Sequence, residues 1–328
     1  MFGATELSFT YPSGRRGLGR VTLLGDPGDR VVVMGPNGSG KSTLLRLVST
    51  ELPSLPGALT LFDGAHGRSS REVRRRIGIV QDTPVHIDDL TGMENGLLFA
   101  ELYGLPRDKS ASALEALFTS LGLDDALHVP TGEYSYGMKK KLLIAQALVH
   151  DPEMLILDEP ALGLDPPSRE ALLRILEERS EKGVCTLVAT NEPGLAEALA
   201  TEVVFLHEGE VVAHGSPSDL LAQVGGATRI EVHVTGPTTP ALEGLPANII
   251  SVQRLPGRII AESGSGADVL PQMVDAVLSA GLKIERVELR EPDLADVFTH
   301  FTGQALAAQS PTSGTKGQPF GTGEKEDA

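Results

Sequence analysis

The chain has 328 residues, enough for two domains with sizeable cores, and its formal net charge is −16 at pH 7. This acidic balance argues against nucleic acid or an anionic lipid surface as the main partner. The single cysteine, Cys185, excludes a disulfide within the chain, and its apolar neighbours favour a small core residue in a reducing compartment.

The apolar runs are much shorter than the ~20 residues that span a bilayer, and the N-terminus lacks a basic segment followed by an apolar one. We therefore expect a soluble, cytoplasmic protein. The eight histidines form no HxH or HxxxH pair, so they predict no metal site. We interpret both local basic clusters as solvated helix faces: Arg71, Arg74, Arg75 and Arg76, then Lys139, Lys140 and Lys141.

Residues 5–24 alternate apolar and polar positions around a turn at 12–14, which predicts two antiparallel strands. An apolar strand, Val31–Met34, then leads into a glycine-rich loop and a helix-like segment, Leu44–Val48. The loop fits the phosphate-loop spacing G-x-x-x-x-G-K-[ST] from Gly35 to Ser42. Strand, glycine loop and helix are the context that this motif needs.

The residue types of the loop explain its chemistry. Glycines let backbone N–H groups approach phosphate oxygens, and the following helix N-terminus favours negative charge. Lys41 supplies a point charge for the outer phosphates, and Ser42 supplies a hydroxyl for Mg²⁺.

Strands are next predicted at Leu59–Phe62, before an Asp63-Gly64 turn, and at Arg76–Val80, which ends at Gln81. Residues 88–150 then change character, because their apolar residues follow helical spacing. We expect a helical subdomain here, inserted between two core strands. Its helices are predicted at Thr91–Tyr103, Ser110–Leu121 and Met138–Val149.

Met154–Leu157 is a short apolar run suited to a buried parallel strand, and two carboxylates, Asp158 and Glu159, stand at its end. Ligands bind at the carboxyl ends of strands in open α/β sheets. Together with the phosphate loop, these acids favour a Mg²⁺ shell and action on a water molecule. A helix at about Ser168–Lys182 follows, and strands return near 184–190, 202–206 and 211–213.

A domain boundary is predicted near Gly225-Gly226, and residues 227–303 read as a small α+β domain. Its predicted strands are Arg229–Thr235, Ile249–Arg254, Ile259–Glu262 and Ile284–Leu289, and its predicted helices are Asp268–Ala280 and Asp293–Phe301. Residues 304–328 have little to bury, and we expect them to be a disordered tail.

Taken in order, the motifs of residues 4–225 resemble the ATP-binding subunit of an ABC transporter. Gly35–Thr43 matches the Walker A motif, Gln81 the Q-loop, and Tyr134–Met138 the ABC signature. Walker B ends at Asp158, and Ala161–Asp165 matches the D-loop. The signature and Glu291–Phe298 are similar to exporter subunits whose permease is a separate polypeptide, such as drug-resistance and sodium-export members.

The resemblance implies a fold and a set of roles. The fold is α/β, a P-loop NTPase core sheet with an antiparallel β subdomain, a helical subdomain at about 85–150 and an ATP-binding domain over 1–226. The cofactors are ATP and Mg²⁺. The implied nucleotide-binding residues are Tyr11, Gly35, Pro36, Asn37, Gly38, Ser39, Gly40, Lys41, Ser42, Thr43, Gln81, Ser135, Gly137 and Asp158. The implied metal ligands are Ser42, Gln81 and Asp158, and the implied catalytic residues are Glu159, Lys41, Gln81 and Asn191.

In this family two ATP-binding domains meet head to tail, and each site takes the signature of the other subunit. Ser135 and Gly137 are therefore expected to serve the partner's γ-phosphate, in a homodimer or a heterodimer. The other implied partner is a separately encoded permease, which would hold the protein at the inner face of the cell membrane. The acidic balance predicts no nucleic-acid partner.

Two positions depart from the family pattern. Tyr136 stands where glycine is commonest, and Asn191 stands where the H-loop normally has histidine. Asn191 keeps a second interpretation open, a weakly hydrolysing subunit paired with a competent one, although the intact Glu159 opposes it. A third, a soluble ABC ATPase of translation or chromosome maintenance, is disfavoured by the single ATP-binding domain and the absence of a long coiled-coil insertion.

Overall fold

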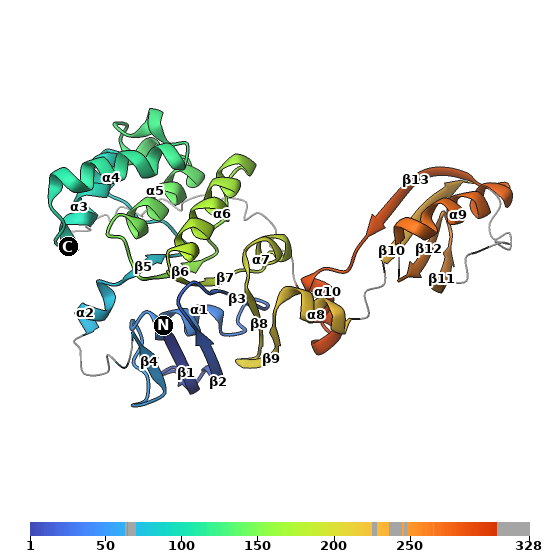
Figure 1. Ribbon diagram of the computed structural model, residues 1–328, viewed down its shortest axis with the longest axis horizontal. Coiled ribbons are helices and arrows are strands. Elements are labelled where there is room, and N and C mark those ends of the chain that lie inside the picture. The colour runs from blue at the N-terminus through green and yellow to red at the C-terminus, as the bar shows by residue number, and fades with distance from the viewer. Residues whose placement is uncertain are drawn as a thin grey trace, which may run out of the picture.

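The computed structural model describes residues 1–62, 64, 70–224, 228–235, 245, 248–264 and 266–306. Figure 1 shows a larger α/β body and, to one side, a smaller sheet with its own helix. The predicted turn residue Asp63, the boundary at Gly225-Gly226 and residues 307–328 of the predicted tail lie outside the described residues. No helix in the described part of the chain is long and apolar enough to cross a membrane.

A six-stranded sheet forms the centre of the α/β body. Its strands lie in the order β5 (Ile77–Val80), β6 (Met154–Asp158), β7 (Cys185–Ala189), β3 (Arg30–Met34), β8 (Glu202–His207) and β9 (Glu210–Gly215). All neighbours are parallel except β8 and β9, which pair as an antiparallel hairpin. Parallel order across β5–β6–β7–β3–β8 brings the carboxyl ends of these strands to one edge.

The parallel strands are apolar on both faces, as a sheet covered on both sides requires. In β3, Val32 and Met34 join one core cluster, while Val31 and Val33 join the other. The same alternation along β6 places its residues in both clusters. This double burial explains why these strands read as continuous apolar runs in the sequence.

One face of the central sheet is covered by α1 (Lys41–Val48) and a second, antiparallel sheet. That sheet has the strand order β2 (Arg16–Gly25), β1 (Phe2–Thr10) and β4 (Leu59–Leu61). The predicted antiparallel subdomain is confirmed. The short helix α2 (Ser70–Arg74), which apolar spacing does not indicate, precedes β5.

The predicted helical segment between β5 and β6 is confirmed. It contains α3 (Gly92–Leu102), α4 (Arg107–Ser120), η2 (Asp124–Ala126), η3 (Thr131–Glu133) and α5 (Tyr136–Leu148). Thr91 begins α3 with a capping box, in which its hydroxyl accepts from Glu94 N at 3.2 Å. Three further helices, α6 (Pro166–Glu181), α7 (Pro193–Leu199) and α8 (Pro217–Gln223), complete the larger body.

The smaller sheet is antiparallel throughout and has the order β11 (Ile249–Leu255), β12 (Arg258–Ser263), β10 (Thr228–Thr235) and β13 (Lys283–Arg290). Helix α9 (Gly266–Ser279) covers it, with Val269, Met273 and Val277 on one helical face and fully buried. These residues share a separate core cluster with β10 and β12.

The last helix, α10 (Leu294–Thr302), packs on the larger body and not on the smaller sheet (Figure 1). Leu294, Val297 and Phe298 are fully buried in the same core cluster as the helical subdomain, and the Phe298 ring lies 5.8 Å from that of Phe205. The chain therefore leaves the larger body before β10 and returns to it after β13.

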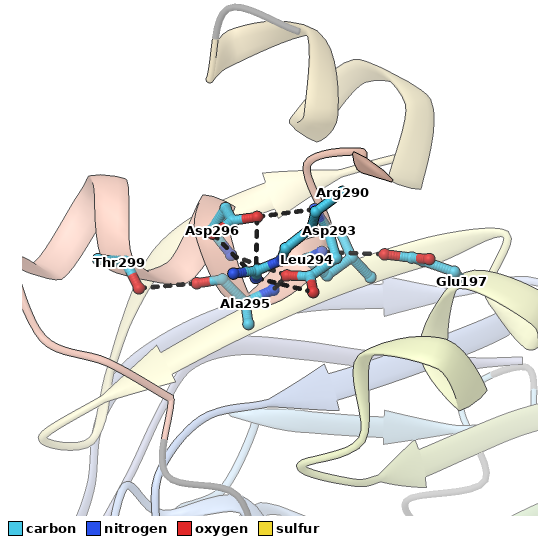
Figure 2. Close-up of polar contacts among 7 residues, drawn as sticks. All are labelled: Glu197, Arg290, Asp293, Leu294, Ala295, Asp296 and Thr299. Atoms are coloured by element: carbon cyan, nitrogen blue, oxygen red, sulfur yellow. Dashed lines mark hydrogen bonds and ion pairs between the residues drawn. The ribbon is translucent and has the colours of Figure 1, made fainter. Parts of the chain in front are cut away.

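Polar contacts fix the start of α10 (Figure 2). Asp293 caps the helix by accepting from Ala295 N at 2.8 Å, and Arg290 donates to Asp293 at 3.1 Å. Leu294 N donates to Glu197 Oε1 on α7 at 2.9 Å. Because α7 begins two residues after Asn191, this bond joins the C-terminal segment to the element that follows the H-loop position.

Candidate functional site

The strand register gathers the predicted site residues at one edge of the central sheet. Val80 of β5 pairs with Leu157 of β6, Asp158 pairs with Ala189 of β7, and Ala189 pairs with Val33 of β3. The residues that follow these strand ends are Gln81, Glu159, Thr190-Asn191 and the glycine loop at 35–40. We call this the nucleotide edge.

Two loop glycines stand where no side chain fits. A Cβ on Gly35 would lie 2.1 Å from the Leu206 carbonyl oxygen, and one on Gly40 would lie 2.7 Å from that of Gly17. Gly40 also has a φ of 110°, which L side chains rarely adopt. These constraints hold the turn tight, so that α1 starts directly behind it with its N–H groups facing the loop.

Lys41 begins α1 and is buried. Its Nζ donates to the carbonyl oxygens of Gly35 at 2.6 Å and Pro36 at 3.3 Å, so the side chain curls back over the loop. Burial lowers the pKa of Lys41, whereas the nearby charges of Glu159 and Asp158 act to raise it. The lysine therefore lies between the loop and the two acids.

The Ser42 side chain lies near the Asp158 carboxyl. Burial raises the pKa of Asp158, and the Ser42 hydroxyl and the charges of Lys41 and Lys140 counteract this. A hydroxyl and a carboxylate near one another are oxygen donors of the kind that Mg²⁺ takes from a protein when phosphates and water supply its remaining ligands. The donor set at Ser42 and Asp158 thus fits a nucleotide-bound Mg²⁺.

Glu159 has a left-handed backbone, with φ of 44°, which is uncommon for a residue with a Cβ. Its N–H donates to the Ala189 carbonyl at 2.9 Å, and its Oε2 accepts from Thr190 Oγ1 at 3.1 Å. Burial raises the pKa of Glu159 to about 7, against the lowering effects of Thr190 and Lys41. Such a carboxyl group can exchange a proton near neutral pH.

Asn191 is buried beside the loop, and its Nδ2 donates to Asn37 Oδ1 at 3.2 Å. Its Oδ1 has no hydrogen-bond partner among the described residues. Asn191 and Glu159 line one cavity of about 350 Å³ together with Pro193 and with Ala295 and Leu306 of the C-terminal segment. The H-loop position therefore faces both the glycine loop and the acid.

Tyr11 lies against the helix that follows the loop. Its hydroxyl and Thr43 Oγ1 are 3.0 Å apart, and its ring meets the edge of Phe9 with centroids 5.0 Å apart. The Arg15 guanidinium lies 4.8 Å from the Tyr11 ring centroid. The remaining loop candidates, Pro36, Asn37, Gly38 and Ser39, form the turn between β3 and α1.

Gln81 stands between two cavities. One, of about 420 Å³, reaches Asp158 and the α1 residues Leu45 and Arg46. The other, of about 390 Å³, opens on the helical subdomain and is lined by α3 residues that include Leu98 and Leu102. Gln81 therefore touches both the nucleotide edge and the surface of the helical subdomain.

Lys140 is fully buried, so the interpretation of the lysine run as a solvated helix face is wrong at this position. Its Nζ donates to the carbonyl oxygens of Gln81 and Asp82, each at 2.8 Å, and to that of Asp158 at 3.3 Å. Burial lowers its pKa to about 8. One ammonium group thus holds the Q-loop backbone to the end of β6.

A signal for Lys140 was present in the sequence. Ile144 and Leu148 are buried on α5, and stepping back four residues along this face leads to Lys140. Tyr136, which motif matching identifies only as a departure from the family pattern, is a second such residue. Its hydroxyl donates to the Asp82 carbonyl at 3.0 Å, so it also holds the Q-loop.

The predicted signature residues lie at the start of α5. Ser135 is the N-cap of α5 and accepts from Met138 N at 3.2 Å. A Cβ on Gly137 would lie 2.6 Å from the Gly163 carbonyl oxygen, so the signature packs closely on the D-loop segment. Within the described residues, no hydrogen bond joins Ser135 or Gly137 to residues 35–43.

Comparisons with known proteins agree with this geometry. The family model described as ABC transporter matches residues 18–162. A fluoroquinolones export ATP-binding protein from Mycobacterium tuberculosis is 30% identical over 309 residues, covering 92% of each chain. A solved structure of the ATP-binding subunit of an ABC transporter is 32% identical, with a TM-score of 0.63 over 69% of this chain and 93% of that one.

A dimeric ATP-binding cassette in a post-hydrolysis state, bound to ADP and Pi, is 25% identical, with a TM-score of 0.57 over 66% of this chain and 98% of that one. The chain therefore belongs to the ABC transporter family, as one of its ATP-binding subunits and an ABC ATPase. The predicted family and P-loop α/β fold are confirmed, whereas the roles of individual site residues stay predictions.

Proposed function

We propose that this chain hydrolyses ATP to energise an export transporter whose permease is a separate polypeptide. The observation that carries the proposal is the nucleotide edge, where Lys41 lies between the glycine loop and the acids Asp158 and Glu159. The export direction is supported by the likeness to a fluoroquinolones export ATP-binding protein over 92% of both chains. The permease would place the protein at the inner face of the cell membrane.

The residues of the edge divide the chemistry between them. Lys41 would leave the carbonyl oxygens of Gly35 and Pro36 and offset charge on the transferring phosphoryl group. Glu159, oriented by Thr190, would polarise the attacking water. Ser42, Gln81 and Asp158 would hold Mg²⁺, which supplies charge neutralisation at the phosphates when it is bound. Tyr11 would stack on adenine beside Thr43.

A second ATP-binding subunit would complete each site. Ser135 caps α5, and the N-terminus of this 13-residue helix favours negative charge. Because the signature residues make no hydrogen bond to residues 35–43 of their own chain within its described part, they suit the γ-phosphate of a head-to-tail partner. The proposal applies equally to a homodimer and a heterodimer.

The groove on the helical subdomain would receive the permease. It is the cavity of about 390 Å³ that Gln81 shares with Val85, Ile87, Leu98 and Leu102, and we call it the α3 groove. Val85 and Leu102 are 77% and 73% exposed, which is costly for apolar side chains unless another surface covers them. Gln81 would pass the nucleotide state to this groove, because it lines the cavity at Asp158 as well.

Cross-linking from single cysteines tests this assignment. Val85→Cys and Leu102→Cys, made in a Cys185→Ala background, should cross-link to a co-purifying membrane protein. Ile250→Cys is the matched control, because Ile250 is an exposed apolar residue of the smaller sheet. Cross-links from Ile250→Cys alone would show that the permease contact was placed on the wrong domain.

Within the segment predicted at 227–303, we propose that the smaller sheet and α9 form an accessory domain that regulates the ATPase or stabilises its dimer. No group of three or more metal-ligating residues occurs in the described part of the chain, and the smaller sheet has a core of its own. Joining residue 228 to residue 291 by a short linker removes the sheet and α9 but keeps α10. ATP affinity should stay unchanged, and a folded variant that no longer binds ATP would contradict the proposal.

One observation favours the alternative of a weakly hydrolysing subunit paired with a competent one. Asn191 donates to Asn37 and, unlike a protonated histidine, brings no positive charge to the γ-phosphate. The intact and oriented Glu159 opposes this alternative. The exchange Asn191→His, described below, separates the two.

A further inference from the structure

One side chain, Tyr136, contacts two loops of the nucleotide site from the position of a third. It is the first residue of α5 and follows the helix cap Ser135 directly. Its hydroxyl donates to the Asp82 carbonyl oxygen at 3.0 Å, and its ring lies against Gly163 of the D-loop segment. The signature, the Q-loop and the D-loop of one chain therefore meet at this residue.

The contact with the Q-loop is reinforced one helical turn further along α5. Tyr136 and Lys140 lie on the same helical face, and Lys140 Nζ also donates to the Asp82 carbonyl oxygen, at 2.8 Å. A carbonyl oxygen has two lone pairs, so both are used here. Burial and the charge of Asp82 raise the pKa of Tyr136, which keeps its hydroxyl protonated as a donor. A shift of α5 would thus be passed to the backbone beside Gln81.

The contact with the D-loop leaves no room for a side chain at its centre. Gly163 has a φ of 78°, and a Cβ there would lie 2.5 Å from Cδ1 of the Tyr136 ring. A Cβ on Gly137 would lie 2.6 Å from the Gly163 carbonyl oxygen, so two successive residues of α5 touch this glycine. Leu162 N, one residue before it, donates to the Glu159 carbonyl oxygen at 3.3 Å. A displacement of the ring would therefore press on the segment that follows Glu159.

Both contacts depend on a residue that departs from the family pattern. Glycine, the commonest residue at this position, has neither a ring nor a hydroxyl. Tyr136 is 43% exposed, so burial in a core does not account for a side chain of this size here. The link that its ring and hydroxyl make is therefore a feature of this chain's own signature.

We propose that Tyr136 is a positioning residue that couples the two nucleotide sites of the head-to-tail dimer. Ser135 and Gly137 would meet the γ-phosphate held by the partner. Tyr136, which stands between them, would carry their displacement to the Q-loop and D-loop of its own chain. ATP bound at one site would then place Gln81 and Glu159 for hydrolysis at the other. This inference rests on the dimer of the proposed function, and it adds how the two sites regulate one another.

Tyr136→Phe tests the coupling, because it keeps the ring on Gly163 and removes the donor to Asp82. ATPase activity is measured against ATP concentration on the full chain with its co-purifying permease. We expect the Hill coefficient to fall from roughly 2, the limit for two coupled sites, to roughly 1. The kcat should fall about three- to tenfold, which corresponds to the loss of one net hydrogen bond.

A merely structural role for the hydroxyl would act on a different readout. The isolated subunit has no partner to couple with, so Tyr136→Phe should leave its ATP affinity unchanged in calorimetry. Ser120→Ala is the control, because it removes another exposed hydroxyl of the helical subdomain, one that donates to the Ala116 carbonyl oxygen on α4 at 2.8 Å. This control should keep the Hill coefficient and the kcat of the native complex.

The possible outcomes separate the coupling from the proposed function. If Tyr136→Phe keeps the native Hill coefficient, or if the native complex shows no cooperativity in ATP, the coupling is wrong while the ATPase assignment stands. Weaker ATP binding by the isolated Tyr136→Phe subunit would mean that the residue supports its own site, which also overturns the coupling. A native complex that hydrolyses no ATP would contradict the proposed function and this inference with it.

Discussion

The nucleotide edge and the α3 groove differ in how their side chains are accommodated by the rest of the chain. Polar side chains at the edge form hydrogen bonds within the chain, whereas apolar side chains of the groove stay exposed to solvent. At the edge, Lys41, Glu159 and Asn191 all have hydrogen-bond partners within the described part of the chain. In the groove, Val85 and Leu102 remain more than 70% exposed although apolar residues of this size favour burial. The polar side chains named at the edge are thus held in place by contacts within the chain, whereas the apolar side chains of the groove lie in solvent.

Lys140 connects the two regions. Its ammonium group holds the backbone of Gln81 and Asp82, from which the groove segment continues, to Asp158 at the edge. A change in the nucleotide site can therefore reach the groove through a buried and fully hydrogen-bonded contact. This connection is one physical route by which the Q-loop can follow the nucleotide state.

The largest expected effect comes from breaking that connection. Lys140→Met keeps much of the side-chain length but removes the donor to three part-buried carbonyl groups, which should cost about 2–4 kcal/mol in the free energy of unfolding. Chemical denaturation measures it. The variant should also lose much of its ATPase activity, because Gln81 is no longer held.

Lys139→Met is the control on the same helix. Lys139 Nζ pairs with Asp88 at 2.9 Å at a more exposed position, where an ion pair contributes about 1 kcal/mol or less. If both variants lost the same free energy of unfolding, the contact of Lys140 with the carbonyl groups of Gln81, Asp82 and Asp158 would not have the importance assigned to it.

A smaller effect is expected at Asn191. Asn191→His places a longer and chargeable side chain beside the glycine loop, where it can reach the γ-phosphate and stabilise transition-state charge. We expect kcat to rise several-fold. ATP affinity should stay nearly unchanged, because the glycine loop at 35–40 would provide most of the contacts that bind ATP. Steady-state ATPase assays with the permease present make the comparison.

If the native chain already has the same kcat as Asn191→His, the interpretation as a weakly hydrolysing subunit is wrong. The interpretation as a fully active ATPase subunit then stands. Glu159→Gln in the same assay should abolish turnover in both backgrounds. That result checks that the activity comes from this site and not from a contaminant.

The smallest effect is expected in the groove of the isolated subunit. Leu102→Gln removes an apolar side chain that is 73% exposed, so the free energy of unfolding should change by no more than about 0.5 kcal/mol. ATP affinity should not change either. A loss of several kcal/mol would mean that Leu102 packs within the subunit, and the contrast between edge and groove would disappear.

Much of the nucleotide edge could be predicted from the sequence because its chemistry fixes residue types at fixed spacings. The glycines of residues 35–40 are needed by a turn with close backbone approaches, and Lys41 and Ser42 must follow directly. Asp158 and Glu159 could be placed at the same edge because parallel strands end together. The strand and helix pattern of the larger body was also predictable from apolar spacing.

The remaining features depend on tertiary contacts between distant parts of the chain. Lys140 shares a helical face with Ile144 and Leu148, but the carbonyl groups of Gln81, Asp82 and Asp158 that hold its charge come from distant parts of the chain. Short helices such as α7 and α8 have too few turns for a clear period. The packing of Phe298 on Phe205 joins segments 93 residues apart, so the apolar face of α10 does not reveal which domain it covers.

The central claim is that the glycine loop binds ATP through Lys41, and isothermal titration calorimetry tests it most directly. Lys41→Ala removes a charge-assisted contact of about 1.5–3 kcal/mol, so ATP affinity should fall about ten- to a hundredfold while the fold is kept. Arg174→Ala, which removes an exposed cation from α6, should leave affinity almost unchanged. If Lys41→Ala binds ATP as tightly as the native chain, the assignment of the nucleotide edge is wrong.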